Sequence, residues 1–261
     1  MIKLVVTDID GTLLDDKKNL SPDFWKTVEQ LARKNIIFSV ASGRQYYTLE
    51  HQFARIAADM LFLAENGTYV VYQNRELFTE PLDLAAARDF IKIGRTITDA
   101  YPILCGKNSA YVENDEEQFI AATRHYYERY LRVNDLLKVE DTILKVTLFD
   151  FHDAEKNAYP HFKPYERRYK IAPAGKRWVD ITALAANKGS ALRRVQRQLG
   201  ISPDETLVFG DYLNDMEMMS EATYSYAMKN AHPEIIKAAK FVTERDNNDH
   251  GVVATIRDLC L

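Results

Sequence analysis

The sequence predicts an α/β protein with a Rossmann-like, doubly wound parallel-sheet core and an inserted α+β domain. Three observations lead to this fold class. Buried strand patterns alternate with helix patterns at the start of the chain, a different mixture interrupts them, and the alternation then resumes. With 261 residues, the chain is long enough for a substantial core and for two domains.

The first 81 residues alternate strands with helices, as right-handed crossovers in a parallel sheet require. A helix is expected to begin at Ser21-Pro22-Asp23, with Ser21 as its N-cap and Pro22 at its first position. A second helix is expected over Tyr46–Ala57. The strand patterns cover Lys3–Thr7, Ile36–Ala41, Met60–Ala64, and a hairpin of Tyr69–Tyr72 and Glu76–Thr79.

The pattern changes after Pro81 to separated strands and longer polar helices. The expected strands are Ile103–Cys105, Ala110–Val112, Leu144–Phe149, Tyr169–Ala172 and Trp178–Ile181. The expected helices are Leu84–Ala100, Glu116–Tyr130 and Ala154–Tyr165. This α+β character predicts an inserted domain over residues 82–183, flanked by core segments 1–81 and 184–261.

The αβ alternation resumes at Lys188. A helix pattern runs from Lys188 to Gly200, and a buried strand, Thr206–Phe209, follows it. Further short αβ units lead to the end of the sequence. This return to the first pattern predicts that one core domain is split by the insertion.

Composition excludes several classes of protein. The net charge of −4 argues against nucleic-acid binding. No apolar run approaches the roughly 20 residues of a membrane span, and the first residues form a strand pattern rather than a signal peptide. Cys105 and Cys260 have neither metal-binding nor redox spacing. We therefore predict a cytoplasmic protein without a membrane or nucleic-acid partner.

The segment Asp8-Ile9-Asp10-Gly11-Thr12-Leu13 is the most informative part of the sequence. It places two carboxylates two positions apart where a buried strand ends and a glycine follows. A structural turn or a calcium loop are the alternatives, but the β-like segment before Asp8 argues against a calcium loop. Two such close anions repel each other unless a cation holds them. The motif predicts a divalent metal, a nucleophilic carboxylate and a carboxyl that transfers protons.

Polar clusters recur at comparable places along the core segments. Ser42 follows the second strand, Lys188 opens a helix, and Asp211 precedes Asn214 and Asp215 after a later strand. Strand ends on one edge of a parallel sheet converge in space. Together they supply a nucleophile, a hydroxyl donor, a cation and further carboxylates. This inventory favours phosphoryl transfer, which depends on positioning and charge neutralisation.

These segments resemble the four motifs of the haloacid dehalogenase (HAD) superfamily, in order and across the whole chain. The elements that carry the resemblance are Asp8-x-Asp10-Gly-Thr, Ser42-Gly-Arg44, Asn187-Lys188-Gly and Gly210-Asp211-x-x-Asn214-Asp215. The Glu65-Asn66-Gly67 element, the place of the insertion, Met228-Lys229-Asn230-Ala231 and Asp249-His250-Gly251-Val252 are similar to those of Cof-like, type IIB sugar-phosphate phosphatases. The resemblance implies a HAD-like core and makes the insertion a cap domain that sets substrate specificity.

The resemblance also implies the chemical roles. Asp8 would attack phosphorus and form an aspartyl-phosphate, and Asp10 would act as general acid and then general base. Lys188 would pair with Asp8 and the phosphate. The residues implied in phosphate or substrate binding are Ile9 and Gly43 through their backbone amides, and Ser42, Arg44, Lys188 and Asn214.

A metal site follows from the same resemblance. Mg²⁺ would bind Asp8, the backbone carbonyl of Asp10, and Asp211, while Asp215 would orient Lys188 or a metal-bound water. Asn66 would reach the site or shape the turn before Gly67, and Asn214 could instead be the N-cap of a helix over Asp215–Ser220. Tyr212 stands where the subgroup often has asparagine, so the edge of the substrate pocket is expected to differ while the chemistry is retained.

The sequence therefore predicts a cytoplasmic, Mg²⁺-dependent phosphatase acting on small phosphorylated metabolites. Sugar phosphates are the leading substrate class, and flavin and pyridoxal phosphates remain open. A phosphomutase with the same intermediate and a catalytically silent metabolite-binding regulator are the alternatives. The chain is expected to be a monomer or a weak homodimer.

Overall fold

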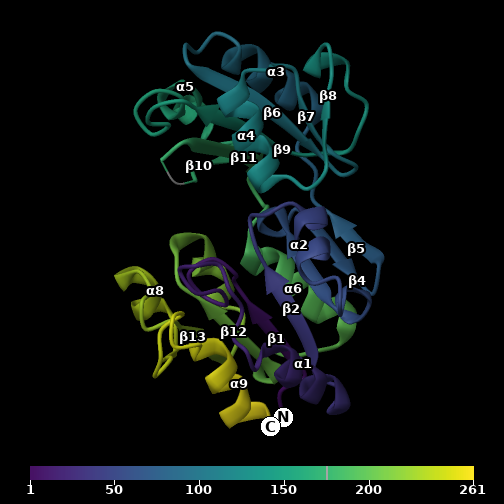
Figure 1. Ribbon diagram of the computed structural model, residues 1–261, viewed down its shortest axis with the longest axis vertical. Coiled ribbons are helices and arrows are strands. Elements are labelled where there is room, and N and C mark those ends of the chain that lie inside the picture. Colours follow the sequence, from purple (N-terminus) through teal and green to yellow (C-terminus); the bar gives the residue numbers. More distant parts are fainter. Residues whose placement is uncertain (175) are drawn as a thin grey trace. The chain divides into compact units, whose positions relative to one another are not determined.

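The computed structural model describes residues 1–174 and 176–261, and the chain divides into two compact units (Figure 1). The first unit consists of Met1–Gly43, Phe53–Phe78 and Asn187–Leu261. The second unit consists of Arg44–Gln52 and Thr79–Ala186. The expected insertion over residues 82–183 lies within the longer segment of the second unit.

The segment Arg44–Gln52 lies within the predicted core segment 1–81 but groups with the second unit. Gln45 explains this grouping, because its Nε2 donates to the Arg129 carbonyl at 2.8 Å and its Oε1 accepts from the Arg129 N–H at 3.0 Å. The Thr48 hydroxyl adds a bond to the Tyr126 carbonyl at 3.2 Å. Such contacts between distant residues leave no periodic pattern in the sequence.

The first unit is built on an eight-stranded sheet with the order β14-β13-β12-β1-β2-β3-β4-β5. The pairs from β14 to β3 are parallel, and β4 runs antiparallel to β3. The strands are β1 (Leu4–Thr7), β2 (Ile37–Ala41), β3 (Leu61–Ala64), β4 (Tyr69–Tyr72), β5 (Arg75–Thr79), β12 (Thr206–Gly210), β13 (Tyr224–Ala227) and β14 (Phe241–Val242). This is the predicted doubly wound parallel sheet.

The α-helices of the first unit form two groups, defined by the elements that they contact. The α-helices are α1 (Phe24–Arg33), α6 (Lys188–Leu199), α7 (Met216–Met219), α8 (Pro233–Ala238) and α9 (Gly251–Cys260). Helix α1 packs against α9 and β2, whereas α7 contacts α6, α8 and β12. Strands β1, β3 and β12 are buried along their whole length, so the core lies at the middle of the sheet.

The second unit has a six-stranded sheet with the order β10-β11-β9-β6-β7-β8. Its strands are β6 (Ala100–Gly106), β7 (Ala110–Val112), β8 (Tyr130–Arg132), β9 (Ile143–Asp150), β10 (Tyr169–Pro173) and β11 (Trp178–Ala183). Its α-helices are α2 (Tyr46–Gln52), α3 (Leu84–Gly94), α4 (Glu117–Tyr126) and α5 (Tyr159–Phe162). One apolar cluster joins Phe90 of α3 to Leu148 of β9, and another joins Phe119 of α4 to Phe149. Adjacent strand residues point to opposite faces, so both faces carry an apolar cluster.

Several helices are shorter than the sequence pattern predicts. The helix expected over Tyr46–Ala57 ends at Gln52, and the one expected over Leu84–Ala100 ends at Gly94, before β6 begins. The helix expected over Ala154–Tyr165 is reduced to Tyr159–Phe162, because Pro160 and Pro164 supply no N–H to continue it.

Two further boundaries differ from expectation. The residues expected to form one helix over Glu116–Tyr130 leave it after Tyr126, and Tyr130 begins β8, which pairs with β7. The N-cap of α1 is Asp23 rather than Ser21. The Ser21 hydroxyl instead accepts the N–H of Asp23 at 3.3 Å, so this serine shapes the turn before the helix.

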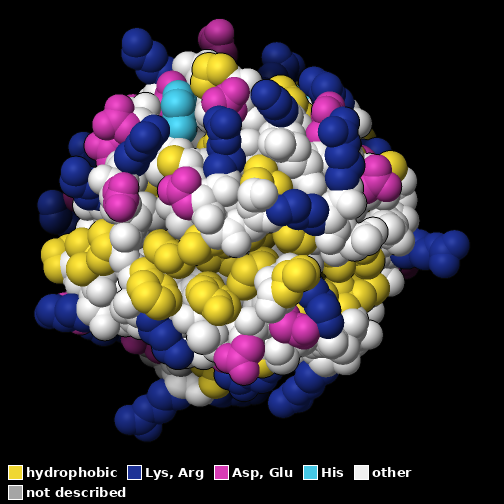
Figure 2. Space-filling view, turned by 90° about the horizontal axis from the view of Figure 1, so that it is seen from below, with side chains coloured by type: hydrophobic (Ala, Val, Ile, Leu, Met, Phe, Trp, Pro, Cys, Tyr) yellow, Lys and Arg dark blue, Asp and Glu magenta, His cyan; other side chains and the backbone are white. Residues whose placement is uncertain are grey.

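The face shown in Figure 2 carries a band of apolar side chains bordered by lysine and arginine. Figure 1 marks both chain ends on this side of the first unit. Met1, Leu259 and Leu261 are exposed near these ends and line a hollow together with Ile2 and Ile36. Because Ile2 precedes the amino end of β1, this hollow lies at the edge of the sheet opposite the carboxyl ends of its strands. Among the described residues, helix length and hydropathy nowhere suffice for a membrane span.

Candidate active site

Polar residues from distant parts of the sequence meet at the carboxyl edge of the first unit's sheet. Strand β1 lies between β12 and β2, with all three parallel. Asp8 follows β1, Ser42 follows β2, and Asp211 follows β12. The Asp8 N–H donates to the Phe209 carbonyl at 3.0 Å, which fixes the start of the Asp8 segment beside β12. Ligands of open α/β sheets bind at this edge.

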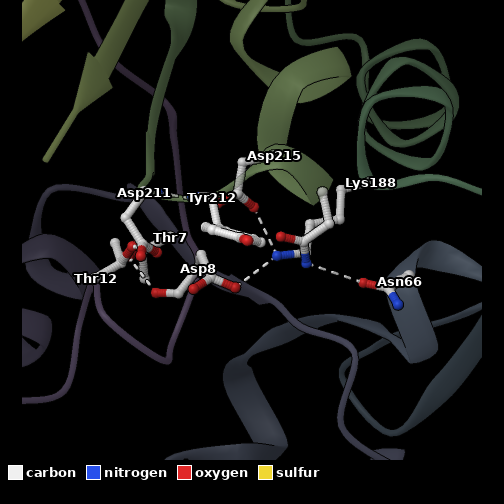
Figure 3. Close-up of polar contacts among 9 residues, drawn as sticks. Thr7, Asp8, Thr12, Asn66, Lys188, Asp211, Tyr212 and Asp215 are labelled. Atoms are coloured by element: carbon white, nitrogen blue, oxygen red, sulfur yellow. Dashed lines mark hydrogen bonds and ion pairs between the residues drawn. The ribbon is translucent and has the colours of Figure 1, made fainter. Parts of the chain in front are cut away.

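Lys188 links two carboxylates at the centre of the site (Figure 3). Its Nζ lies 2.5 Å from Asp8 Oδ1 and 2.6 Å from Asp215 Oδ1. The Lys188 side chain is fully buried, as is that of Asp215, and Asp8 is nearly so. Asn187 caps α6 by accepting the Ser190 N–H at 2.7 Å. This cap fixes Lys188 as the first residue of the helix. The lysine is thus a counter-ion for two buried anions.

Burial and charge shift the titration of these groups. Burial raises the pKa of Asp8 to about 8, and the nearby carboxylates of Asp215 and Asp211 add to the shift while Lys188 opposes it. Burial alone would lower the pKa of Lys188, but the contacts with Asp215 and Asp8 reverse this and raise it. Lys188 therefore stays protonated. Because burial disfavours the ionised form of Asp8, a further positive charge beside Asp8 would stabilise that form.

Asp211 stands beside Asp8 and is oriented by Thr12. The Thr12 hydroxyl donates to Asp211 Oδ1 at 2.7 Å. Burial raises the pKa of Asp211 to about 6, although the Thr12 hydrogen bond lowers it. Gly11, at φ +82°, makes room for this carboxylate, because a Cβ there would lie 2.4 Å from Asp211 Oδ2.

Asp215 is fixed by hydrogen bonds on both of its oxygens. Its Oδ1 faces Lys188, while its Oδ2 accepts the N–H groups of Asp211 at 3.0 Å and Tyr212 at 3.3 Å. Gly210 allows this loop to close, since a Cβ there would meet Asp215 Cβ at 2.6 Å. Asp215 thereby holds both Lys188 and the backbone that presents Asp211.

The acidic groups could hold a metal ion. Carboxylate oxygens of Asp8, Asp211 and Asp215 lie within 4.8 Å of one another. The donor set consists of oxygen only, which suits a hard divalent cation. Because both oxygens of Asp215 already accept hydrogen bonds, Asp8 and Asp211 are the better ligands.

Ser42 follows β2 and Asn66 follows β3, whereas Asn214 lies in the short turn between Asp211 and α7. Ser42 is buried, and its carbonyl accepts the Asn66 N–H at 2.8 Å. Asn66 has φ 57°, so it shapes the turn, and its Oδ1 accepts from Asn214 Nδ2 at 3.3 Å. Asn214 is not the N-cap of a helix, because Asp215 stands at the N-cap of α7. Gly43 packs against the Asn66 amide, since a Cβ there would lie 3.1 Å from Asn66 Nδ2.

The other predicted residues lie as follows. Ile9 is fully buried, and its carbonyl accepts the Leu14 N–H at 2.9 Å. Arg44 belongs to the second unit, where its Nη1 donates to Gln52 Oε1 at 2.9 Å, so its contact with phosphate stays a prediction. Tyr212 is 58% exposed, and its ring meets His232 edge to face.

Asp10 differs from Asp8 in its surroundings. Its side chain is 42% exposed and forms an ion pair with Lys18 at 2.8 Å. Sequence reasoning missed Lys18 because a lysine in a polar loop has no distinctive pattern. It also gave no role to Thr12, although the threonine directly follows the glycine of the Asp8 motif.

Comparison with known proteins agrees with this geometry. The sequence matches the haloacid dehalogenase-like hydrolase family over residues 5–256. It is 33% identical over 259 residues to 5-amino-6-(5-phospho-D-ribitylamino)uracil phosphatase of Escherichia coli, covering 98% of this chain and 95% of that protein. A crystal structure from Eubacterium rectale matches with a TM-score of 0.89 at 30% identity, covering 98% of each chain.

A more distant structure, that of a HAD subclass IIB sugar phosphatase, has a TM-score of 0.81 at 19% identity, covers 98% of each chain, and supports the fold alone. The chain belongs to the haloacid dehalogenase-like hydrolases. It is a phosphatase, a phosphoric monoester hydrolase of this family. The resemblance to the haloacid dehalogenase superfamily is confirmed. The expected HAD-like core is confirmed by the shared fold.

Proposed function

We propose that this chain is a Mg²⁺-dependent phosphatase of small phosphorylated metabolites, with sugar phosphates as the leading class and an aspartyl-phosphate on Asp8 as intermediate. The observation that supports it most is the pair formed by Asp8 and Lys188. A carboxylate at the carboxyl edge of the sheet lies 2.5 Å from a fully buried ammonium. Once a bound cation offsets the effect of burial on Asp8, this arrangement offers an anionic oxygen for attack beside a fixed charge that attracts the phosphoryl oxygens.

In the first step, a carboxylate oxygen of Asp8 attacks phosphorus, and the bond from phosphorus to the leaving oxygen breaks. Asp10 gives its proton to that oxygen, so the product leaves as a neutral alcohol. Lys188, the Ser42 hydroxyl, and the N–H groups of Ile9 and Gly43 face the phosphoryl oxygens in this proposal. Their fixed donors stabilise the charge that spreads over these oxygens.

In the second step, Asp10 acts as the base. It takes a proton from water while the water oxygen attacks the phosphorus of the aspartyl-phosphate. The bond between phosphorus and Asp8 breaks, which releases inorganic phosphate and restores the Asp8 carboxylate. Asp10 ends protonated, ready for another substrate, so one residue serves both steps.

The metal site uses residues of the same edge. Asp8 and Asp211 would hold Mg²⁺ together with the backbone carbonyl of Asp10, and Asn214 would contact the phosphate. When bound, Mg²⁺ neutralises part of the charge of the phosphate group and of the two carboxylates. Asp215 supports the site through Lys188 and through the backbone of Asp211.

The substrate class is supported by the relatives. The Escherichia coli protein is named for a substrate with a phosphorylated ribityl chain. A polyol phosphate of this kind shares its reacting group with sugar phosphates. Flavin and pyridoxal phosphates stay in the set to be tested because they too are primary phosphomonoesters.

Phosphate release tests the proposed function directly. We expect turnover of para-nitrophenyl phosphate and of one or more members of a panel of sugar, ribityl, flavin and pyridoxal phosphates with Mg²⁺ present. Chelation is expected to lower the rate at least ~10²-fold, since charge neutralisation by a metal contributes several kcal/mol. An isomeric phosphate ester without free phosphate would identify a mutase, and tight binding without turnover would identify a regulator.

We also propose that the second unit is a cap that sets the choice of substrate. Its sheet holds a nearly buried ion pair, Lys145 Nζ to Asp180 Oδ2 at 3.3 Å, and Asp180 also accepts the Thr147 hydroxyl. Nearly buried ion pairs contribute little net stability. We therefore take this polar cluster of Lys145, Thr147 and Asp180 as the candidate for contacts that select the substrate. Asp180→Asn is expected to change the ratio of kcat/KM between two sugar phosphates. Hydrolysis of para-nitrophenyl phosphate should persist, and an equal loss on all esters would contradict this role.

Compartment and oligomeric state are further parts of the proposal. A reducing cytoplasm is proposed because the two cysteines, Cys105 and Cys260, have neither metal-binding nor redox spacing. A monomer or a weak homodimer is proposed, and sedimentation would distinguish them.

A further inference from the structure

A lysine in the loop after β1 contacts the proposed general acid. Lys18 Nζ donates to Asp10 Oδ1 at 2.8 Å. Both side chains are partly exposed, at 59% for Lys18 and 42% for Asp10. Exposed ion pairs contribute little to folding stability. The contact is therefore not required to maintain the fold, and its effect on the Asp10 carboxylate is the more important consequence.

The backbone of the loop is folded so that Lys18 returns to Asp10. Asp15 closes a tight turn, because its N–H donates to the Asn19 carbonyl at 3.0 Å and its carbonyl accepts the Lys18 N–H at 2.9 Å. Asp15 Oδ1 also accepts the Asn19 N–H at 2.7 Å. Lys18 itself has φ 65°, a left-handed conformation that a side chain disfavours. The closed turn imposes this conformation and directs the lysine back along the loop.

The C-terminal part of the chain holds the same loop from outside. Asn247 is buried, and its Nδ2 donates to the Leu14 carbonyl at 3.1 Å and to Asp16 Oδ1 at 3.0 Å. Asn230 Nδ2 donates to the Gly11 carbonyl at 2.8 Å, and Asn230 Oδ1 accepts the Asn247 N–H at 3.1 Å. The arm of the loop that precedes Lys18 is thus anchored at Gly11, Leu14 and Asp16 by residues near the C-terminus.

We propose that Lys18 is a positioning residue that fixes the Asp10 carboxyl group for proton transfer to the leaving oxygen. A proton donor must lie within hydrogen-bond reach of the atom it protonates. An exposed aspartate samples several side-chain rotamers, and an ammonium on one oxygen selects among them. This inference rests on the proposed function, in which Asp10 is the general acid.

Leaving groups of different basicity test the inference. Nitrophenolate departs from para-nitrophenyl phosphate without needing a proton, whereas the alkoxide of a sugar or ribityl phosphate needs one. We expect Lys18→Met to lower kcat/KM about 10-fold for the alkyl ester and no more than ~2-fold for the aryl ester, because only the alkyl reaction depends on a positioned acid. Lys18→Arg keeps a positive charge at this place and is expected to retain most of the alkyl activity.

The controls separate positioning from folding and from the proposed function. Lys17→Met removes an adjacent exposed lysine and should leave both reactions unchanged. Asp10→Asn should lower kcat/KM, which reports formation of the aspartyl-phosphate, much more for the alkyl than for the aryl ester, while kcat should fall for both because Asp10 is also the base of the second step. An equal loss of kcat/KM on both esters would overturn the proposed function itself. Suppose that Asp10→Asn discriminates between the two esters as expected. A positioning role of Lys18 is then excluded if Lys18→Met leaves kcat/KM at the wild-type value, raises kcat/KM for the alkyl ester, or lowers kcat/KM equally for both esters.

Discussion

Replacing Asp8 with asparagine is expected to abolish phosphate release while the chain remains folded. The amide offers no anionic oxygen to phosphorus, so kcat should fall at least ~10³-fold. Lys188 keeps Asp215 as its counter-ion at 2.6 Å, so the buried ammonium is not left unpaired. Phosphate release from an aryl and an alkyl ester, measured beside thermal unfolding, separates loss of the nucleophile from loss of the fold.

The same variant has an expected pH signature in the presence of a chelator. The pKa of Asp8 is raised from 3.8 to about 8 in the folded chain, chiefly by burial. Between these values the folded state binds more protons than the unfolded state, so this group's contribution to stability is lost as pH rises. Asparagine does not titrate. Asp8→Asn should therefore gain stability relative to wild type from pH 5 to pH 8 (about the range of the shift).

A surface aspartate provides the matched control. Asp23 Oδ2 forms an exposed ion pair with Arg257 Nη1 at 2.8 Å. Asp23→Asn should leave phosphate release and the pH dependence of phosphate release unchanged. Retention of more than ~10% of wild-type activity by Asp8→Asn would exclude Asp8 as the nucleophile. A stability difference that does not vary with pH would exclude the raised pKa.

The central strands of the sheet and the groups at their ends were accessible from the sequence. Asp8, Ser42 and Asp211 each follow a strand of buried residues, and parallel topology brings such ends together. Lys188 was predicted from its place at the start of a helix, where a positive charge is disfavoured by the helix dipole. Local patterns of polarity thus carry the information that places these groups at one edge.

Other features depend on contacts that local patterns do not record. The segment Arg44–Gln52 groups with the second unit through the paired bonds between Gln45 and Arg129, which lie 84 positions apart. Lys18 contacts Asp10 in a loop whose preceding arm is held by Asn230 and Asn247, which are far away in the sequence. Asn214 was a plausible helix cap by residue type, but the helix begins one residue later. In each case, long-range hydrogen bonding overrides a local preference.

Replacing Lys188 with methionine is expected to damage both stability and activity. The change leaves the buried carboxylates of Asp8 and Asp215 without their shared cation, and breaking a buried pair costs about 3–5 kcal/mol. Activity should fall at least ~10²-fold, because the phosphoryl oxygens lose a fixed charge. The matched control is Lys145→Met, which removes a nearly buried lysine of the second unit and should spare hydrolysis of para-nitrophenyl phosphate.

A double variant tests whether charge is the cause. Adding Asp8→Asn to Lys188→Met removes one of the two unpaired anions, so the double variant should be more stable than Lys188→Met alone. Without the lysine, the pKa of Asp8 rises further, because the cation that opposes the shift is gone. The stability deficit of Lys188→Met should therefore shrink as pH falls from about 10 towards 8, the value of the Asp8 pKa while the lysine is present. A deficit that is constant with pH and unrelieved by Asn at position 8 would mean that the lysine stem, through packing, accounts for the loss.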